Sequence, residues 1–90
     1  MTDLELLNMY CVYLGVGINE LLSRRREMRL VKARASIVIC LRDAGWKYQQ
    51  IGRLLNRHHT SIMNLDYKFR NYLKENKYNA WFIKLFIILS

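Results

Sequence analysis

Proline is absent from this sequence of 90 residues, and glycine occurs four times. Proline and glycine are the residues that most often mark the turns between strands. Their scarcity favours helices over a sheet. A chain of this length also supports one hydrophobic core and rarely two. We therefore expect one all-α domain over residues 1–90, with five to six helices around a single core.

Two features indicate an N-terminal helix. Thr2 and Glu5 have the spacing of a capping box, in which each side chain satisfies a backbone N–H of the first turn. Apolar residues then recur at steps of three and four, as on one face of a helix. The helix should end near Gly15 or Gly17, and residues 18–22 should add a short helical turn.

A longer helix is expected in the middle of the chain. Apolar residues recur at helical spacing from Val31 to Ala44, and Gly45 stands where a left-handed C-terminal cap favours glycine. The run from Ser23 to Arg29 interrupts the pattern before this helix with concentrated basic charge. We expect a basic loop there, over residues 23–30.

Residues 47–74 have the pattern of a helix-turn-helix. A short amphipathic segment spans residues 48–55, with Gly52 offering a small surface for a close crossing, and a tight turn is expected at Asn56 and Arg57. The stretch after the turn has one polar face and one apolar stripe at helical spacing. That stripe comprises Ile62, Leu65, Phe69, Tyr72 and Leu73. In a helix-turn-helix the second helix presents its N-terminal residues to the major groove of DNA.

The charge balance points to a polyanionic partner. Fifteen Lys and Arg against seven Asp and Glu give a formal net charge of +8. Such an excess attracts nucleic acid over long range, although a basic surface can also simply keep a small protein soluble. Double-stranded DNA is the expected partner, provided that the cations of Ser23 to Arg29 and the tip of the second helix lie on one side of the molecule.

The run from Arg57 to Ser61 stands at the start of that second helix. Its guanidinium, imidazole and hydroxyl groups suit base edges and phosphates, and a threonine methyl suits thymine. The same residues could be an ordinary polar helix cap, with Asn56 or His58 as the capping residue. Local chemistry leaves both interpretations open.

Several short motifs follow one another in a distinctive order. They are Tyr13-Leu14, the run Glu20 to Ser23 before the basic residues, Val31 to Arg34, Ile51-Gly52, and Arg-His-His-Thr-Ser-Ile from Arg57 to Ile62. Over residues from about Leu7 to Lys74 this order resembles domain IV, the C-terminal DNA-binding domain of the bacterial replication initiator DnaA. The last motif is similar to that family's Arg-Asp-His-Thr-Thr-Val signature. The resemblance implies a helix-turn-helix fold like that of domain IV and of the Trp repressor.

The resemblance also implies a minor-groove contact by the basic loop. Arg26 corresponds to a minor-groove arginine, which a narrow A/T-rich groove would attract, and Arg24 and Arg25 are its neighbouring cations. Arg34 and Arg42 resemble positions that contact phosphates. The loop and the helix would then bind two adjacent grooves of the DNA at the same time.

In the major groove, His59 and Thr60 match base-reading positions, and Ser61 matches a hydroxyl that bonds phosphate. Arg57 should reach the same region. Where the family signature has an acidic residue, this chain has His58, so a possible donor replaces an acceptor for cytosine. We expect a different target sequence as a consequence.

No enzymatic activity, metal or cofactor is expected. The phosphate-binding motif G-x-x-x-x-G-K-[ST] does not occur in these residues, so the nucleotide-binding domain of a full initiator is not represented. Cys11 and Cys40 lie in apolar helical patterns and should be buried reduced thiols. Together with His58 and His59 they could in principle bind a metal, but adjacent histidines on a helix point about 100° apart. We expect a cytoplasmic or nucleoid-associated regulator of transcription or replication, of phage or mobile-element type.

The C-terminal stretch suggests a second possibility. Residues 77–89 should form an apolar helix that is too short for a membrane span of about 20 residues. Trp81, Ile87 and Ile88 are left over from its core-facing side and form an apolar patch. A homodimer or a protein partner could cover this patch. The alternative function is therefore a protein-interaction module, such as an initiator antagonist or a dimeric assembly factor.

Overall fold

The computed structural model describes residues 2–75, with side chains as far as residue 71, and the regular secondary structure in this part of the chain is α-helical throughout. It comprises α1 (Asp3–Leu14), α2 (Ile18–Leu22), α3 (Met28–Asp43), α4 (Tyr48–Leu55) and α5 (His59–Glu75). The all-α prediction is confirmed. The predicted helix at 77–89, with the patch of Trp81, Ile87 and Ile88, lies outside the described residues.

The first helix begins and ends as its sequence predicts. The Thr2 hydroxyl accepts a hydrogen bond from the Glu5 backbone N–H at 3.1 Å and donates to the Glu5 carboxylate at 3.1 Å. At the other end Gly15 has a φ of 69°, and its N–H donates to the Cys11 carbonyl. This left-handed conformation is easy for glycine because it has no Cβ, so the helix ends there.

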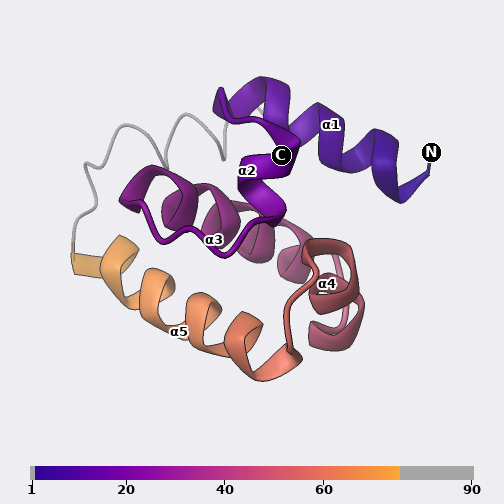
Figure 1. Cartoon of the computed structure of the whole chain (residues 1–90). Coiled ribbons are helices and arrows are strands. Elements are labelled where there is room, and N and C mark those ends of the chain that lie inside the picture. The colour runs from indigo at the N-terminus through magenta and orange to yellow at the C-terminus, as the bar shows by residue number, and fades with distance from the viewer. Residues whose placement is uncertain (1, 76–90) are drawn as a thin grey trace.

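The hydrophobic core surrounds α3, which Figure 1 shows between α1 and α2 on one side and α5 on the other. Ala33, Ile37 and Val38 of α3 are buried among apolar residues of the other four described helices. Ala35 and Ile39, on another side of α3, pack against Phe69 of α5. Because α3 is apolar on more than one side, the remaining helices pack around it.

The basic loop is shorter than predicted. We expected a loop over residues 23–30, but α3 begins at Met28, and Glu27 is its N-terminal cap. The Glu27 carbonyl accepts hydrogen bonds from the N–H groups of Leu30 and Val31 at 2.9 and 3.0 Å. Leu30 is fully buried, and this burial favours an additional helical turn that the basic residues around it obscure in the sequence.

The helix-turn-helix has a tightly packed turn. Asn56 is left-handed, with a φ of 55°, and the N–H of Arg57 donates to the Gly52 carbonyl at 2.8 Å. A Cβ on Gly52 would lie 2.6 Å from the Arg57 carbonyl oxygen. The close contact that we predicted at Gly52 is therefore mainly with the backbone of the following turn, and less with a crossing helix.

A polar cluster connects α3, α4 and α5. The Asp66 carboxylate, on α5, is 3% exposed and accepts a hydrogen bond of 2.6 Å from the Tyr48 hydroxyl of α4. Arg70 donates to Asp66 and, at 2.7 Å, to Asp43 at the end of α3. The hydrogen bond to Asp66 is the main cause that raises the pKa of Tyr48. These bonds fix the angle between the two helices of the helix-turn-helix.

Within residues 2–75, none of the helices combines the length and the apolar character needed to cross a membrane.

Candidate nucleic-acid interface

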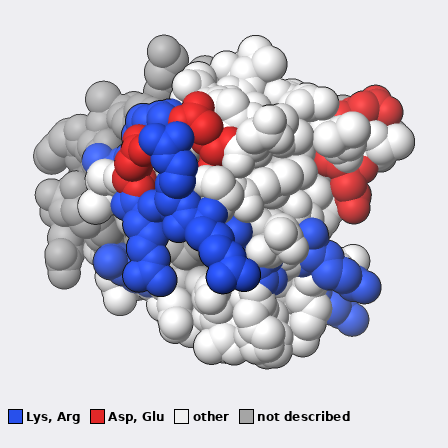
Figure 2. All heavy atoms as spheres, in the orientation of Figure 1, with Lys and Arg blue, Asp and Glu red and all other residues white. Residues whose placement is uncertain are grey.

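One groove brings together the basic loop and the tip of α5. Residues of the loop, the start of α3, the turn and α5 line it; we call it the loop–helix groove. Its lining comprises Arg24, Arg26, Val31, Arg34, Asn56, Arg57, His58, Ser61, Asn64, Leu65 and Lys68. The prediction that the loop cations and the tip of α5 lie on one side of the molecule is confirmed. Figure 2 shows Lys and Arg side chains gathered over the segment between α2 and α3.

Arg34 holds the basic loop in shape. Its guanidinium donates to four backbone carbonyls: those of Leu21 at 2.8 Å, Arg25 at 2.7 Å, Ser23 at 2.9 Å and Glu20 at 3.1 Å. The residue is 4% exposed. Burial is the main cause that lowers the pKa of Arg34, and the positive charge of Arg57 lowers it further. A planar group with five N–H donors can satisfy several carbonyls of a curved loop at once.

Arg57 connects that loop to the turn. Its guanidinium donates to the carbonyl of Ser23 and, at 3.4 Å, to that of Leu22. It also bonds carbonyls of the turn itself, at 3.3 to 3.5 Å. The Ser23 carbonyl therefore accepts from both Arg57 and Arg34. These shared bonds set the distance between the loop and the tip of α5.

Arg34 and Arg57 make contacts that the sequence did not predict. We expected Arg34 to contact phosphate and Arg57 to reach the recognition region. Both line the loop–helix groove, and their guanidinium groups donate to backbone carbonyls 1 to 35 residues away in sequence. Sequence reasoning missed this role because it depends on where the carbonyls of α2 and the loop end up in the fold. The contact of both arginines with DNA stays a prediction.

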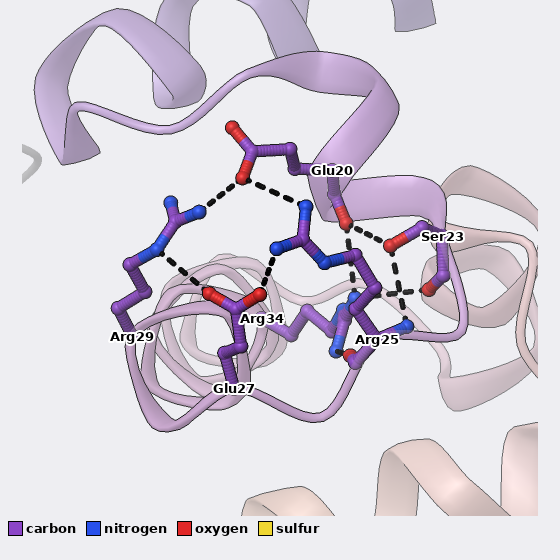
Figure 3. A network of polar contacts seen from close by, with 6 residues as sticks. All are labelled: Glu20, Ser23, Arg25, Glu27, Arg29 and Arg34. Atoms are coloured by element: carbon purple, nitrogen blue, oxygen red, sulfur yellow. Dashed lines mark hydrogen bonds and ion pairs between the residues drawn. The ribbon is translucent and has the colours of Figure 1, made fainter.

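The loop arginines divide into two pairs. Arg25 and Arg29 form ion pairs with Glu20 and Glu27, as Figure 3 shows. Arg24 and Arg26 are exposed and line the groove. Neither of these two makes an ion pair with any residue whose side chain the structure describes.

The tip of α5 combines a cap with exposed polar groups. The His58 Nδ1 accepts from the Thr60 backbone N–H at 3.2 Å, and the His58 carbonyl accepts from Ser61 and Ile62 at 3.0 and 3.3 Å. The capping interpretation thus holds for His58. The side chains of Thr60 and Ser61 remain exposed. The rings of His58 and His59 lie 4.3 Å apart between centroids.

Asn64 and Lys68 were not among the predicted site residues. Both are exposed and line the loop–helix groove. The signal in the sequence was their spacing: they follow Ser61 by three and seven residues, which places them on the same face of α5. A second, shallower hollow on the α4 side of the turn includes His59, together with Gln49 and Arg53.

Arg42 lies away from the loop–helix groove, near the end of α3. Its guanidinium donates to the Trp46 carbonyl at 2.9 Å and stacks on the Tyr48 ring, 4.3 Å from the centroid. A half-buried cation over an aromatic face stabilises the junction of α3 and α4. Its contact with phosphate stays a prediction.

The cysteines are free thiols. Cys11 is buried and Cys40 half-buried, and burial raises the pKa of both, that of Cys40 to about 11. Among the residues that the structure describes, no three His, Cys, Asp or Glu side chains are grouped closely enough to hold a metal ion.

Comparison with known proteins identifies the family. A family model described as the bacterial dnaA protein helix-turn-helix matches residues 5–68, which span α1 to most of α5. No significant match links the chain to a curated protein or to a solved structure. The matched region contains the loop–helix groove, the turn and the Arg-His-His-Thr-Ser motif. The chain belongs to the family of the bacterial dnaA protein helix-turn-helix, a family of DNA-binding domains.

Proposed function

We propose that this protein binds double-stranded DNA sequence-specifically through the loop–helix groove, with the tip of α5 in the major groove and the basic loop in the adjacent minor groove. The observation that carries the proposal is that Arg24 and Arg26 line the same groove as His58 and Ser61. Two separate DNA-contacting elements of the chain thus face one ligand.

The dimensions of DNA fit this arrangement. An α-helix with its side chains is about 10–12 Å wide, and the major groove of B-DNA is about 12 Å wide. The first turn of α5 carries exposed Thr60 and Ser61, whose methyl and hydroxyl groups suit thymine and phosphate. Lys68, two turns further on, would contact the backbone at the groove's edge.

The loop supplies the second contact. Arg24 and Arg26 are the exposed cations there, and guanidinium groups are attracted into narrow A/T-rich minor grooves. The hydrogen bonds of Arg34 and Arg57 hold these two arginines at a fixed distance from α5. The distance between the two DNA-contacting parts of the protein is then fixed. We therefore expect a constant spacing in the DNA between the base-specific core and an A/T-rich flank.

We further propose that the protein regulates transcription or replication from within the cytoplasm or nucleoid, as a phage or mobile-element factor would. Selection from a random duplex library tests the binding mode. The expected product is one core motif with an A/T-rich flank at a constant distance. Selection that enriches no motif would contradict the proposal.

A pair of variants tests the loop. Arg24→Ala with Arg26→Ala should weaken binding to the selected site by about 10- to 100-fold per lost contact. The control is Asn8→Glu with Val12→Glu, which lowers the net charge equally on exposed positions of α1. If both double variants bind with the same affinity, the net charge and not the loop governs binding.

The protein-interaction function predicted from the C-terminal stretch rests on residues outside the described part of the chain.

A further inference from the structure

The basic loop carries its own acidic residues. Glu20 of α2 and Glu27, the cap of α3, stand on either side of the arginine run. In a loop built to attract phosphates, two carboxylates reduce the attraction, because phosphates are repelled by them. Their place in the structure therefore calls for a physical reason.

Each carboxylate bonds the same two arginines. Glu20 Oε2 pairs with Arg29 and, at 3.5 Å, with Arg25; Glu27 pairs with Arg25 through Oε1 and, at 3.2 Å, with Arg29 through Oε2. Figure 3 shows the four side chains as a closed ring of alternating charge. The hydrogen bond from Arg29 is the main cause that lowers the pKa of Glu20.

The arginines of the ring lie outside the loop–helix groove. Arg24 and Arg26 line the loop–helix groove, whereas Arg25 and Arg29 do not. Yet the side chains of Arg25 and Arg29 are 55% and 48% exposed. Without the carboxylates, these two long and mobile cations would be accessible to any phosphate near the loop.

We propose that Glu20 and Glu27 determine specificity by withholding Arg25 and Arg29 from the DNA backbone. Contacts between cations and phosphates carry no sequence information, and they supply essentially all of non-specific binding. Neutralising two of the loop cations lowers affinity for every duplex, while the groove-lining contacts to the correct site are unaffected. The ratio of specific to non-specific binding rises as a result. This inference rests on the proposed DNA-binding function.

The test removes the carboxylates without removing their shape. Glu20→Gln with Glu27→Gln keeps side-chain length, and glutamine can still accept a backbone hydrogen bond near the start of a helix. Each cation that contacts a phosphate adds about 0.9 to the slope of log K against log[salt]. The double variant should therefore show a slope steeper by about 2 on random duplex, and about tenfold tighter non-specific binding at low salt. Its affinity for the selected site should change less, so the specificity ratio should fall.

The matched control is Asp3→Asn with Glu5→Gln. It raises the net charge by the same amount on exposed positions of α1, and glutamine preserves the capping box there. If the control steepens the salt slope as much as the loop variant, or if neither differs from the wild type, the inference is wrong. Far-UV circular dichroism on each variant confirms that it is folded.

A second measurement does not depend on the glutamate variants. Because Arg25 and Arg29 are already paired, Arg25→Gln with Arg29→Gln should change the salt slope by less than about 0.5, against about 2 for two lost phosphate contacts. A loss near 2 would overturn the inference. If the wild type shows no salt-dependent binding to any duplex, the proposed function itself fails; if it binds and the variants behave like the control, only the inference fails.

Discussion

Replacement of Arg34 by methionine tests what the buried guanidinium does. Methionine has a similar apolar stem and a similar helix propensity but no donor. The change removes the guanidinium donor from the carbonyls of Leu21, Arg25 and Ser23, of which Ser23 keeps its hydrogen bond from Arg57. The bond to Leu21 is buried, and the others are partly buried.

The expected cost follows from those bonds. A hydrogen bond to a charged group contributes about 1.5–3 kcal/mol when buried, and we take about 0.5–1 kcal/mol for each partly buried one, because water can replace the donor there. Arg34→Met should thus lower the free energy of unfolding by about 4 kcal/mol. Small domains have about 5–15 kcal/mol in total, so this is a large fraction. Arg34→Lys, which keeps the charge but not the planar fork, should cost about half as much.

Urea unfolding followed by circular dichroism at 222 nm measures both values. Arg53→Met is the control, since Arg53 is exposed on α4 and its loss should change stability by less than about 0.5 kcal/mol. If Arg34→Met costs no more than the control, the loop does not depend on this side chain. On DNA, Arg34→Met should lose affinity for the selected site and keep its salt slope, because the guanidinium it removes bonds backbone carbonyls. A slope reduced by about 0.9 would show that Arg34 contacts phosphate, as the sequence predicted.

Three other outcomes follow from the structure. Gly52→Ala should lower the free energy of unfolding in urea by about 2 kcal/mol, although alanine favours helices. The reason is that the new Cβ would lie 2.6 Å from the Arg57 carbonyl oxygen. Unchanged stability would mean that the turn can move away. Tyr48→Phe and Asp66→Asn should be non-additive by about 1 kcal/mol in a double-mutant cycle, since they share one hydrogen bond, and strict additivity would contradict that bond's contribution. Cys40 should react with iodoacetamide at pH 8 about a thousand times more slowly in the folded protein than a fully ionised thiolate does. The reason is that its pKa of about 11 leaves about one thiol in a thousand ionised at that pH. Fast labelling of the folded protein would refute this.

Much of the helical framework was predictable because the signals for it are local. The box of Thr2 and Glu5, the helix end at Gly15 and the amphipathic pattern of residues 48–55 each depend on residues within one or two turns. The start of α3 was predicted three residues too late, because the buried Leu30 stands among basic residues and its burial depends on helices elsewhere in the chain.

The net charge, the basic run and the motif from Arg57 to Ser61 are all visible in the sequence. Arg24 and Arg26 of the run and Arg57, His58 and Ser61 of the motif line one groove, whereas His59 and Thr60 do not. Asn64 and Lys68 extend the site along α5, and helical spacing alone would have found them.

The sequence by itself determined which helices form, where the turn lies and that the surface is basic, because periodicity, caps and charge act over a few residues. Only the tertiary structure decided what each arginine does. Arg34 and Arg57 donate to carbonyls that folding brings to them, and Arg25 and Arg29 pair with carboxylates. Among the residues whose side chains the structure describes, Arg24 and Arg26 have no carboxylate partner. A guanidinium is charged in every setting, so its role depends on which acceptors surround it, and those come from distant parts of the chain.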